Sequence, residues 1–380
     1  MFYVRLVLSN TTPPMLVPDR TSHPFLTYDM IYEIPETIRE TLKNTRISSA
    51  TDRLGGKDEF YFTGCGTAFF AAMLGAYPLH SSRFRSECVS GLELRQYGYP
   101  LSSRTGLVGV SHSGITKATV DVLKLGRSKG TFGVGITHYP DRPISQAADE
   151  TIVVGNGPDP SRCHTKCYVA GAVACAKISI GILNLKNEVA LAKDLEGSLD
   201  ELPSLTEKVL KSTDSKCKEI ADQNHKRARY YIVGSGPNYA NSLEAALKIM
   251  ETSYCSAQGF DTEQILHGPW ASIDKDTFLI VLAPKGKCYD RNRDLVKAAN
   301  IYGASVLAIV DEDDADISSL CDSIKLPARN ELLAPYLNII PLYLISYYMS
   351  VKNGNNPDML RYLWPKYWEA RQIIFPPGTH

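Results

Sequence analysis

The sequence predicts an α/β protein built from two similar units, each a parallel sheet with helices on both faces in a flavodoxin-like three-layer arrangement. Short, nearly all-apolar segments such as 133–137 and 306–310 alternate with helical segments, which is typical of buried parallel strands. The strands of the first half recur in the second at an offset of about 170 residues, as a duplicated unit would. Glycine turns at 64–67 and 234–236 follow equivalent strands, at the sheet edge where ligands bind in such folds.

The helices follow the strands in the same order in both halves. A helix is expected over 29–43, and the helices at 118–129 and 290–303 follow equivalent strands. Residues 194–224 are expected to form a charged helical connector. We therefore divide the chain into an N-terminal extension at 1–27, a first unit at 28–195, a second unit at 196–353 and a C-terminal tail, a possible lid, at 354–380.

Composition and charge exclude several classes of function. The 380 residues carry 41 basic and 41 acidic side chains, without the Lys/Arg cluster that neutralises nucleic-acid phosphates, so we expect no nucleic-acid partner. The apolar segment 1–8 is far shorter than a membrane span, and no signal cleavage site follows it. We expect no membrane partner and a cytoplasmic location. Nine cysteines without disulfide-like spacing fit a reducing compartment.

One short segment raises the question of a metal ion. Cys163, His164 and Cys167 bring two thiols and an imidazole close together in the sequence. Zinc sites usually need a second ligand pair elsewhere in the chain, and no matching pair is visible. We therefore predict neither a metal nor another cofactor, and regard His164 equally as a pocket residue or as a histidine on a surface turn.

A hydroxyl-rich turn predicts an anion site in the first unit. Ser111, His112, Ser113 and Thr116 lie where a buried strand ends and a helix begins, so backbone N–H groups and the helix dipole attract negative charge. Three hydroxyls around Gly114 add donors that suit a phosphomonoester. Simple helix N-capping is the alternative interpretation of these serines and threonines.

The turn formed by Gly64, Cys65, Gly66 and Thr67 offers a second cradle in the same unit. Its glycines allow close approach of the backbone to a ligand, and Thr67 adds a hydroxyl. The turn lacks the lysine of a nucleotide-binding P-loop and the full dinucleotide fingerprint, so neither kind of nucleotide is indicated.

Acid and base groups gather in the second unit. Glu244, Lys248 and Glu251 project from one face of a helix, and we expect the opposite face, with its leucines, to pack while the charged face is open to chemistry. A solvated surface ion pair is the alternative interpretation. His267 follows in a sharply bent passage, and histidine is the side chain best suited to proton transfer near neutral pH.

Several of these segments also carry a resemblance to a known family. The matching segments are 28–35, 64–67, 111–116, 247–254 and 267–269. Together they resemble the sugar isomerase (SIS) domain family, most closely the tandem-SIS isomerase module of glucosamine-6-phosphate synthases. The likeness runs from about residue 28 onward.

The resemblance implies roles for particular residues. Glu251 would move a proton between C1 and C2 of the sugar, His267 would assist ring opening, and Lys248 would orient or polarise the open chain. The family counterpart of His267 comes from the neighbouring subunit, so a homodimer with shared active sites is implied. Sugar and phosphate contacts would come from Cys65, Gly66, Thr67, Ser111, His112, Ser113 and Thr116.

The sequence departs from the family in three places. No segment ahead of residue 28 is long enough for a glutaminase domain, so we expect that this chain alone does not perform glutamine-dependent synthesis. Cys163 and His164 replace a small residue and a serine, which indicates a changed pocket. Lys366 is one residue out of register with the family's C-terminal lysine and is a candidate lid residue, with ordinary packing of the tail as the alternative.

The predicted function is a phosphosugar isomerase or deaminase acting on a hexose or amino-sugar 6-phosphate, such as glucosamine-6-phosphate giving fructose-6-phosphate. Two alternatives stay open: a phosphosugar-binding regulator without catalysis, which would not need Glu251 or His267, and an isomerase subunit that works with a separate glutaminase chain.

Overall fold

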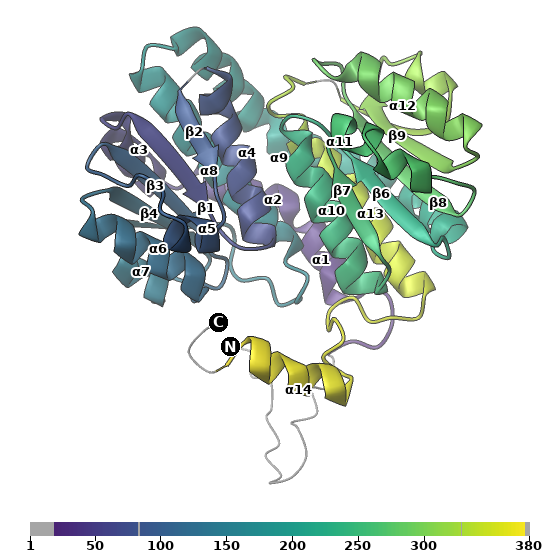
Figure 1. The fold of residues 1–380 in the computed structure, drawn as a ribbon, viewed down its shortest axis with the longest axis horizontal. Helices are drawn as coiled ribbons and strands as arrows, with labels where there is room; N and C mark the ends of the chain where they lie inside the picture. Colours follow the sequence, from purple (N-terminus) through teal and green to yellow (C-terminus); the bar gives the residue numbers. More distant parts are fainter. Residues whose placement is uncertain (1–18, 83, 328, 377–380) are drawn as a thin grey trace.

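The computed structural model describes residues 19–82, 84–327 and 329–376, and it contains two parallel five-stranded sheets lying side by side (Figure 1). The first sheet has the order β2-β1-β3-β4-β5 and the second the equivalent order β7-β6-β8-β9-β10. The strands of the first sheet are β1 Glu59–Thr63, β2 Arg85–Cys88, β3 Thr105–Val110, β4 Phe132–Thr137 and β5 Glu150–Val153. Those of the second are β6 Arg229–Val233, β7 Ala257–Phe260, β8 Thr277–Ala283, β9 Ser305–Asp311 and β10 Asp322–Leu326. The predicted α/β class is confirmed.

Helices cover both faces of each sheet. In the first unit they are α3 Arg46–Gly55, α4 Thr67–Ser81, α5 Gly91–Gln96, α6 Lys117–Ser128, α7 Pro143–Ala147 and α8 Thr165–Leu185. In the second they are α10 Asn238–Ser253, α11 Thr262–Leu266, α12 Tyr289–Ile301 and α13 Pro335–Lys352, with 3₁₀ turns η1 Pro269–Ser272 and η2 Ile317–Ser319. The expected helices at 118–129 and 290–303 are thus found as α6 and α12, within two residues at each end.

One hydrophobic core joins the two units. Alternate strand residues point to opposite faces, so Phe60 and Phe62 of β1 join the shared core while Tyr61 joins a smaller cluster beneath α5, α6 and α7. Ile232 of β6 and Phe278 of β8 enter the same shared core from the second unit. The inner helices α4, α8, α10 and α13 therefore pack between the sheets, which brings the first residues of α4 close to the middle of α10.

The helix α9 Val189–Asn224 runs as a continuous 36-residue element between the units. It contains the expected connector at 194–224, and the division predicted between residues 195 and 196 falls inside it. A different helix, α8, is the one described segment long and apolar enough to cross a membrane, with a mean hydropathy of 1.6. Because 78% of that window is buried inside the fold, α8 is accounted for as a core helix.

The helix expected over 29–43 is divided in two. α1 Leu26–Tyr32 ends at Glu33, and α2 Ile34–Leu42 begins at the next residue with Pro35 in its first turn. A proline has no N–H to continue the preceding helix, which explains the division. Of the extension at 1–27, residues 1–18 lie outside the described residues.

The C-terminal tail is hydrogen-bonded to the start of α1 and to the segment just before α8. The Asp358 carboxylate accepts hydrogen bonds from the backbone N–H groups of Leu26 at 2.9 Å and Thr27 at 2.7 Å, at the start of α1. The backbone carbonyl of Pro357 accepts from the Cys163 thiol at 3.1 Å. The last helix, α14 Pro365–Ile374, lies outside both α/β units (Figure 1).

Close packing of α4 against α8 makes a prediction about stability. An alanine Cβ at Gly75 would lie 2.1 Å from the Cβ of Cys175, so the two helices must separate to admit it. We expect Gly75→Ala to lower the free energy of unfolding by about 1–3 kcal/mol, measured by chemical denaturation.

The matched control is Gly197→Ala, at a glycine inside α9. Among the described residues, a Cβ added there would meet no atom within 4 Å beyond its own helix backbone and chain neighbours. Alanine there should raise the free energy of unfolding by about 0.5–1 kcal/mol. Equal effects of the two substitutions would contradict the tight contact between α4 and α8.

Candidate functional site

The hydroxyl-rich turn lies at the carboxyl end of β3, next to the turn that follows β1. The chain leaves these neighbouring strands toward opposite sides of the sheet, so both turns flank its topological switch point, where α/β sheets bind ligands. The Ser111 hydroxyl donates to Thr116 Oγ1 at 3.0 Å and accepts from the Gly114 N–H at 3.1 Å. Thr116 is the N-cap residue of α6, but within the described residues its side chain makes no capping hydrogen bond. The hydroxyls of Ser111 and Ser113 accept from N–H groups of the turn itself, so the anion cradle stays a prediction beside local capping.

Glycine is required at both turns. Gly114 has φ +70°, and a Cβ there would lie 2.6 Å from Cβ of Arg142. A Cβ at Gly64 would lie 2.7 Å from the backbone carbon of Ala68 in the first turn of α4. Gly66 has φ +55° and precedes Thr67, the first residue of α4, so the backbone can turn sharply into that helix.

Hydrogen bonds from Lys248 of the second unit join it to the first unit. Its side chain is 2% exposed, and its ammonium donates to Thr67 Oγ1 at 3.0 Å, to Glu251 Oε2 at 2.7 Å and to the Cys163 carbonyl. These three acceptors match its three N–H donors. Lys248 is therefore better placed to position Glu251 beside the turn at 64–67 than to polarise a substrate directly. We call this turn the sugar turn, after its expected role.

The charged face of α10 is its buried face. Glu244 is fully buried, with one carboxylate oxygen 3.4 Å from Lys248 Nζ and accepting from the Tyr343 hydroxyl at 3.0 Å. Met250, on the face expected to pack, is 42% exposed. The expected orientation and the surface-ion-pair alternative were therefore both wrong, because the shared core lies on the charged side of the helix and supplies partners for each charge.

Burial sets the electrostatics of this group. It raises the pKa of Glu244 to about 7, with Lys248 opposing the shift and Glu251 adding to it. Burial alone would lower the pKa of Lys248, but the two carboxylates outweigh it and the pKa lies above its usual range. The ammonium stays charged, and the Glu251 side chain, 25% exposed, is the member of the group that reaches solvent.

His267 lies on the outside of this chain. Its side chain is 73% exposed, with Nδ1 2.7 Å from the Glu263 carbonyl and 3.6 Å from the Glu263 carboxylate. Among the described residues, neither contact links it to Glu251. The prediction that it enters the site of a neighbouring subunit stays a prediction.

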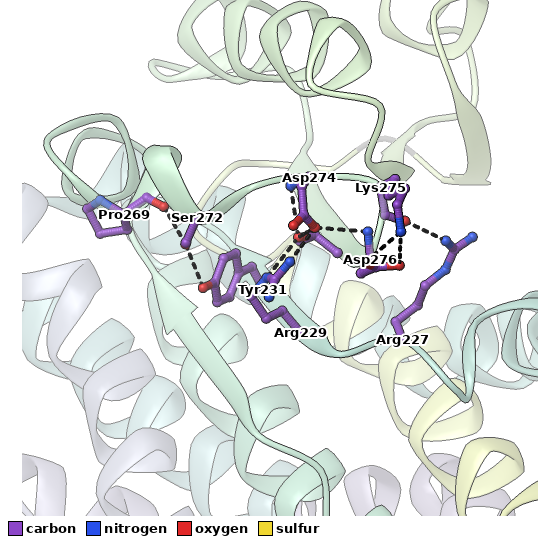
Figure 2. Close-up of polar contacts among 9 residues, drawn as sticks. Arg227, Arg229, Tyr231, Pro269, Ser272, Asp274, Lys275 and Asp276 are labelled. Carbon is purple, nitrogen blue, oxygen red and sulfur yellow. Dashed lines mark hydrogen bonds and ion pairs between the residues drawn. The ribbon is translucent and has the colours of Figure 1, made fainter.

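The segment after His267 is fastened to the second sheet (Figure 2). The Ser272 hydroxyl donates to the Pro269 carbonyl at 2.6 Å and lies 2.8 Å from the Tyr231 hydroxyl on β6. Arg229, at the start of β6, forms an ion pair with Asp274 just before β8. These contacts hold the loop that carries His267 on a rigid element, so its exposure follows from a defined loop position.

The tail contacts the end of α10 through aromatic residues, and Lys366 takes no part in the Lys248 group. Lys366 is exposed, and its ammonium lies 5.5 Å from the ring centroid of Tyr367. The Arg361 guanidinium lies over the rings of Tyr254, Trp364 and Tyr367 at 4.4, 4.9 and 4.9 Å. Trp364 contacts Tyr254 but is itself 46% exposed, so the lid role of Lys366 and ordinary packing of the tail both stay predictions.

Buried imidazole and thiol groups surround the base of the hydroxyl-rich turn at 111–116. We call this turn the phosphate loop, after its expected role. The rings of His112 and His138 are 5.9 Å apart, and those of His112 and His164 are 6.0 Å apart. The ligand atoms of His112, His138 and Cys167 lie within 4.8 Å of one another, and so do those of Asp159, His164 and Cys167. His164 thus faces the phosphate loop. Cys163, which donates to Pro357, does not join either group.

Sequence reasoning missed His138 and Asp159. His138 directly follows the predicted strand at 133–137, so the rule that identified the Ser111 turn also applied to it. Asp159 stands in an irregular loop, where no sequence signal marked it.

Comparison with known proteins places this chain in a family. The SIS domain matches residues 54–175 and 224–352, two segments that together make up more than half of the chain. The chain belongs to the SIS domain family. The first SIS match begins just before β1, the second just before β6, and they contain the sugar turn and α10 respectively.

Curated relatives of this SIS protein are longer than it is. The glutamine–fructose-6-phosphate aminotransferase of Pyrococcus horikoshii is 32% identical over 341 residues, which cover 88% of this chain and 56% of the relative. That of Thermococcus kodakarensis is 26% identical over 91% of this chain and 58% of the relative. The chain thus spans a little over half the length of these relatives and resembles their isomerase region.

Solved structures share the tandem SIS fold. The C-terminal domain of glucosamine-fructose-6-phosphate aminotransferase from Francisella tularensis has a TM-score of 0.80 at 22% identity, covering 88% of this chain and 98% of that one. Glucosamine-6-phosphate deaminase from Thermotoga maritima has a TM-score of 0.70 at 19% identity, covering 88% and 97%. At such identities the likeness shows the fold alone.

The shifted pKa of Glu244 predicts a pH-dependent stability. The native carboxyl keeps its proton to about pH 7, whereas the unfolded one, with a pKa of 4.5, loses it earlier. Between these values the native state binds more protons, so the free energy of unfolding should fall as pH rises, by up to about 3 kcal/mol. Glu244→Gln removes this titration. Its stability relative to wild type should therefore increase from pH 4.5 to 7 in denaturation measurements, and a constant difference would contradict the shift.

Proposed function

We propose that this chain is a phosphosugar isomerase or deaminase that moves a proton between C1 and C2 of a hexose or amino-sugar 6-phosphate. One observation carries the proposal: Lys248 joins Glu251 of the second unit to Thr67 of the first, so a partly exposed carboxylate lies beside a turn suited to a sugar. The glutamine–fructose-6-phosphate aminotransferases named above support the same substrate class.

The proposed reaction uses Glu251 as the base. Aldose–ketose interconversion requires a carboxylate that removes a proton next to a carbonyl and returns it to the neighbouring carbon. Lys248 holds one oxygen of Glu251 at 2.7 Å, which leaves the other oxygen to reach the substrate. The buried ammonium of Lys248 also compensates the charge of the Glu251 carboxylate.

Substrate orientation is assigned to the first unit. The Ser111 turn would bind the 6-phosphate through the hydroxyls of Ser111, Ser113 and Thr116 and the backbone N–H groups at the start of α6. Binding energy from this remote phosphate would hold C1 and C2 against Glu251. Lys248 is given a positioning role, because its donors are already engaged.

The assembly and setting follow from the same proposal. A homodimer would supply His267 from the neighbouring subunit to assist ring opening, which accounts for an acid/base residue held on the outside of its own chain. The proposed partner is a small-molecule sugar phosphate in the cytoplasm. Synthesis with ammonia from a separate glutaminase chain would use the same residues.

Substitution of Glu251 tests the proposed base. Glu251→Gln keeps the shape of the side chain and its acceptor oxygen for Lys248 but cannot accept the proton. We expect turnover of glucosamine-6-phosphate to fructose-6-phosphate to fall by at least about 10²–10⁴-fold, with the dissociation constant for the sugar phosphate changed little. Product formation and calorimetric binding measure the two quantities.

Glu219→Gln, an exposed position on α9, is the matched control and should leave both quantities unchanged. If the protein were a non-catalytic regulator, then wild type, Glu251→Gln and Glu219→Gln would bind the sugar phosphate equally well, and none of them would show turnover. That result, across hexose and hexosamine 6-phosphates, would contradict the proposed enzyme.

Mixing two inactive variants tests the shared site. Glu251→Gln and His267→Ala should each be inactive alone. In a mixed dimer one of the two sites receives an intact Glu251 from one chain and an intact His267 from the other. With half of the dimers mixed, subunit exchange should restore about one quarter of wild-type activity. If the mixture, shown by mass to contain mixed dimers, is no more active than its components, His267 does not act across the interface.

A further inference from the structure

Several polar atoms in the cluster at the base of the phosphate loop have no hydrogen-bond partner among the described residues. Among the described residues, both ring nitrogens of His138, Nε2 of His112 and Oδ2 of Asp159 are buried without a hydrogen bond. His138 is 4% exposed and Asp159 7%. Burying such atoms unpaired costs about 1–3 kcal/mol each, so a set of four in one place requires an explanation.

The unpartnered atoms converge on one thiol. Cys167, 2% exposed in the first turn of α8, has its sulfur within 4.8 Å of nitrogens of both His112 and His138. It is also within 4.8 Å of ligand atoms of Asp159 and His164. Two imidazoles and a thiol, with a carboxylate and a third imidazole adjoining them, are the donors that zinc prefers.

We infer that this cluster is a zinc site, with His112, His138 and Cys167 as three ligands and Asp159 or His164 as the fourth. In a tetrahedral site the ligand atoms lie about 2.0–2.3 Å from zinc and therefore about 3.3–3.8 Å from one another. The present separations are bounded at 4.8 Å within each group of three, so binding would draw the side chains closer together.

The charges around the cluster permit a cation. Lys166 is paired with the Glu33 carboxylate at 2.6 Å, and Lys248 with Glu251 at 2.7 Å and Glu244 at 3.4 Å, so both lysines are neutralised by other groups.

The position of the site suggests what the ion would hold together. His112 lies between the two serines of the phosphate loop after β3, His138 follows β4, and Cys167 belongs to α8. A bound zinc would link these three segments and so fix the position of the phosphate loop. His112 and His138 would take the place of the second ligand pair, whose absence from the sequence had argued against a metal.

Zinc content and cobalt spectroscopy test the inference. Protein freed of any affinity tag, grown with zinc and passed through gel filtration, should contain about one zinc per chain by mass spectrometry. Exchange of Co²⁺ for zinc should give visible bands of tetrahedral cobalt together with a near-ultraviolet thiolate-to-cobalt band. The thiolate band identifies cysteine as a ligand in the wild-type protein, without any substitution.

Substitutions then identify which thiol binds. Cys167→Ser and His138→Asn should each weaken zinc affinity by at least about 10–100-fold, and Cys167→Ser should abolish the thiolate band. Cys163→Ser is the matched control, since its buried sulfur faces Pro357, and it should keep both the zinc and the band. Circular dichroism verifies that each variant is folded.

Folded wild-type protein that binds no zinc and gives no thiolate band would overturn the inference. Loss of the band in Cys163→Ser together with its retention in Cys167→Ser would do the same. Neither result bears on the proposed isomerase, because Glu251 and Lys248 are not among the ligands.

Discussion

The buried ammonium of Lys248 is the constraint on which the rest of the site depends. A charge removed from water destabilises a fold unless it is fully hydrogen-bonded and compensated, and here the compensation comes from both units. Thr67 and the Cys163 carbonyl belong to the first unit, while Glu244 and Glu251 belong to the same helix as the lysine. The two units cannot move apart at this point without exposing the charge or leaving it unpaired. The position of the Glu251 carboxylate relative to the sugar turn is therefore fixed by electrostatics as well as by packing.

The two units contribute different parts of the candidate site. The switch point of the first sheet brings two glycine turns together, at the edge where such sheets bind ligands. The second unit contributes a helix whose charged face points into the shared core. The tail reaches the same region through Arg361 over Tyr254, three residues beyond Glu251. One hydrophobic core thus holds both the glycine turns and α10.

Two buried polar groups in this protein differ in how they are satisfied. Around Lys248 the ammonium has three acceptors, and Tyr343 donates to one oxygen of Glu244, whose other oxygen has no partner among the described residues. Around Cys167, Nε2 of His112 and both ring nitrogens of His138 have no partner among the described residues. Charges that compensate one another stabilise one native arrangement, whereas an unpaired set of good ligands is stabilised when an ion binds.

By itself, the sequence determined the α/β class, the order of strands and helices and the residues at the strand ends, because these depend on local hydrophobic period and on turn chemistry. The positions of Ser111 and Thr116 after β3, and of Lys248 and Glu251 on one helix, were predicted for that reason. Only the tertiary structure decided which face of α10 is buried, since that depends on what packs against the helix and not on its own pattern. It alone brought His138, from the end of β4, to Cys167 on α8, because contacts between distant strands and helices leave no periodic signal in the chain. It also turned His267 outward, a position that loop contacts such as Ser272 with Tyr231 impose and that no motif specifies.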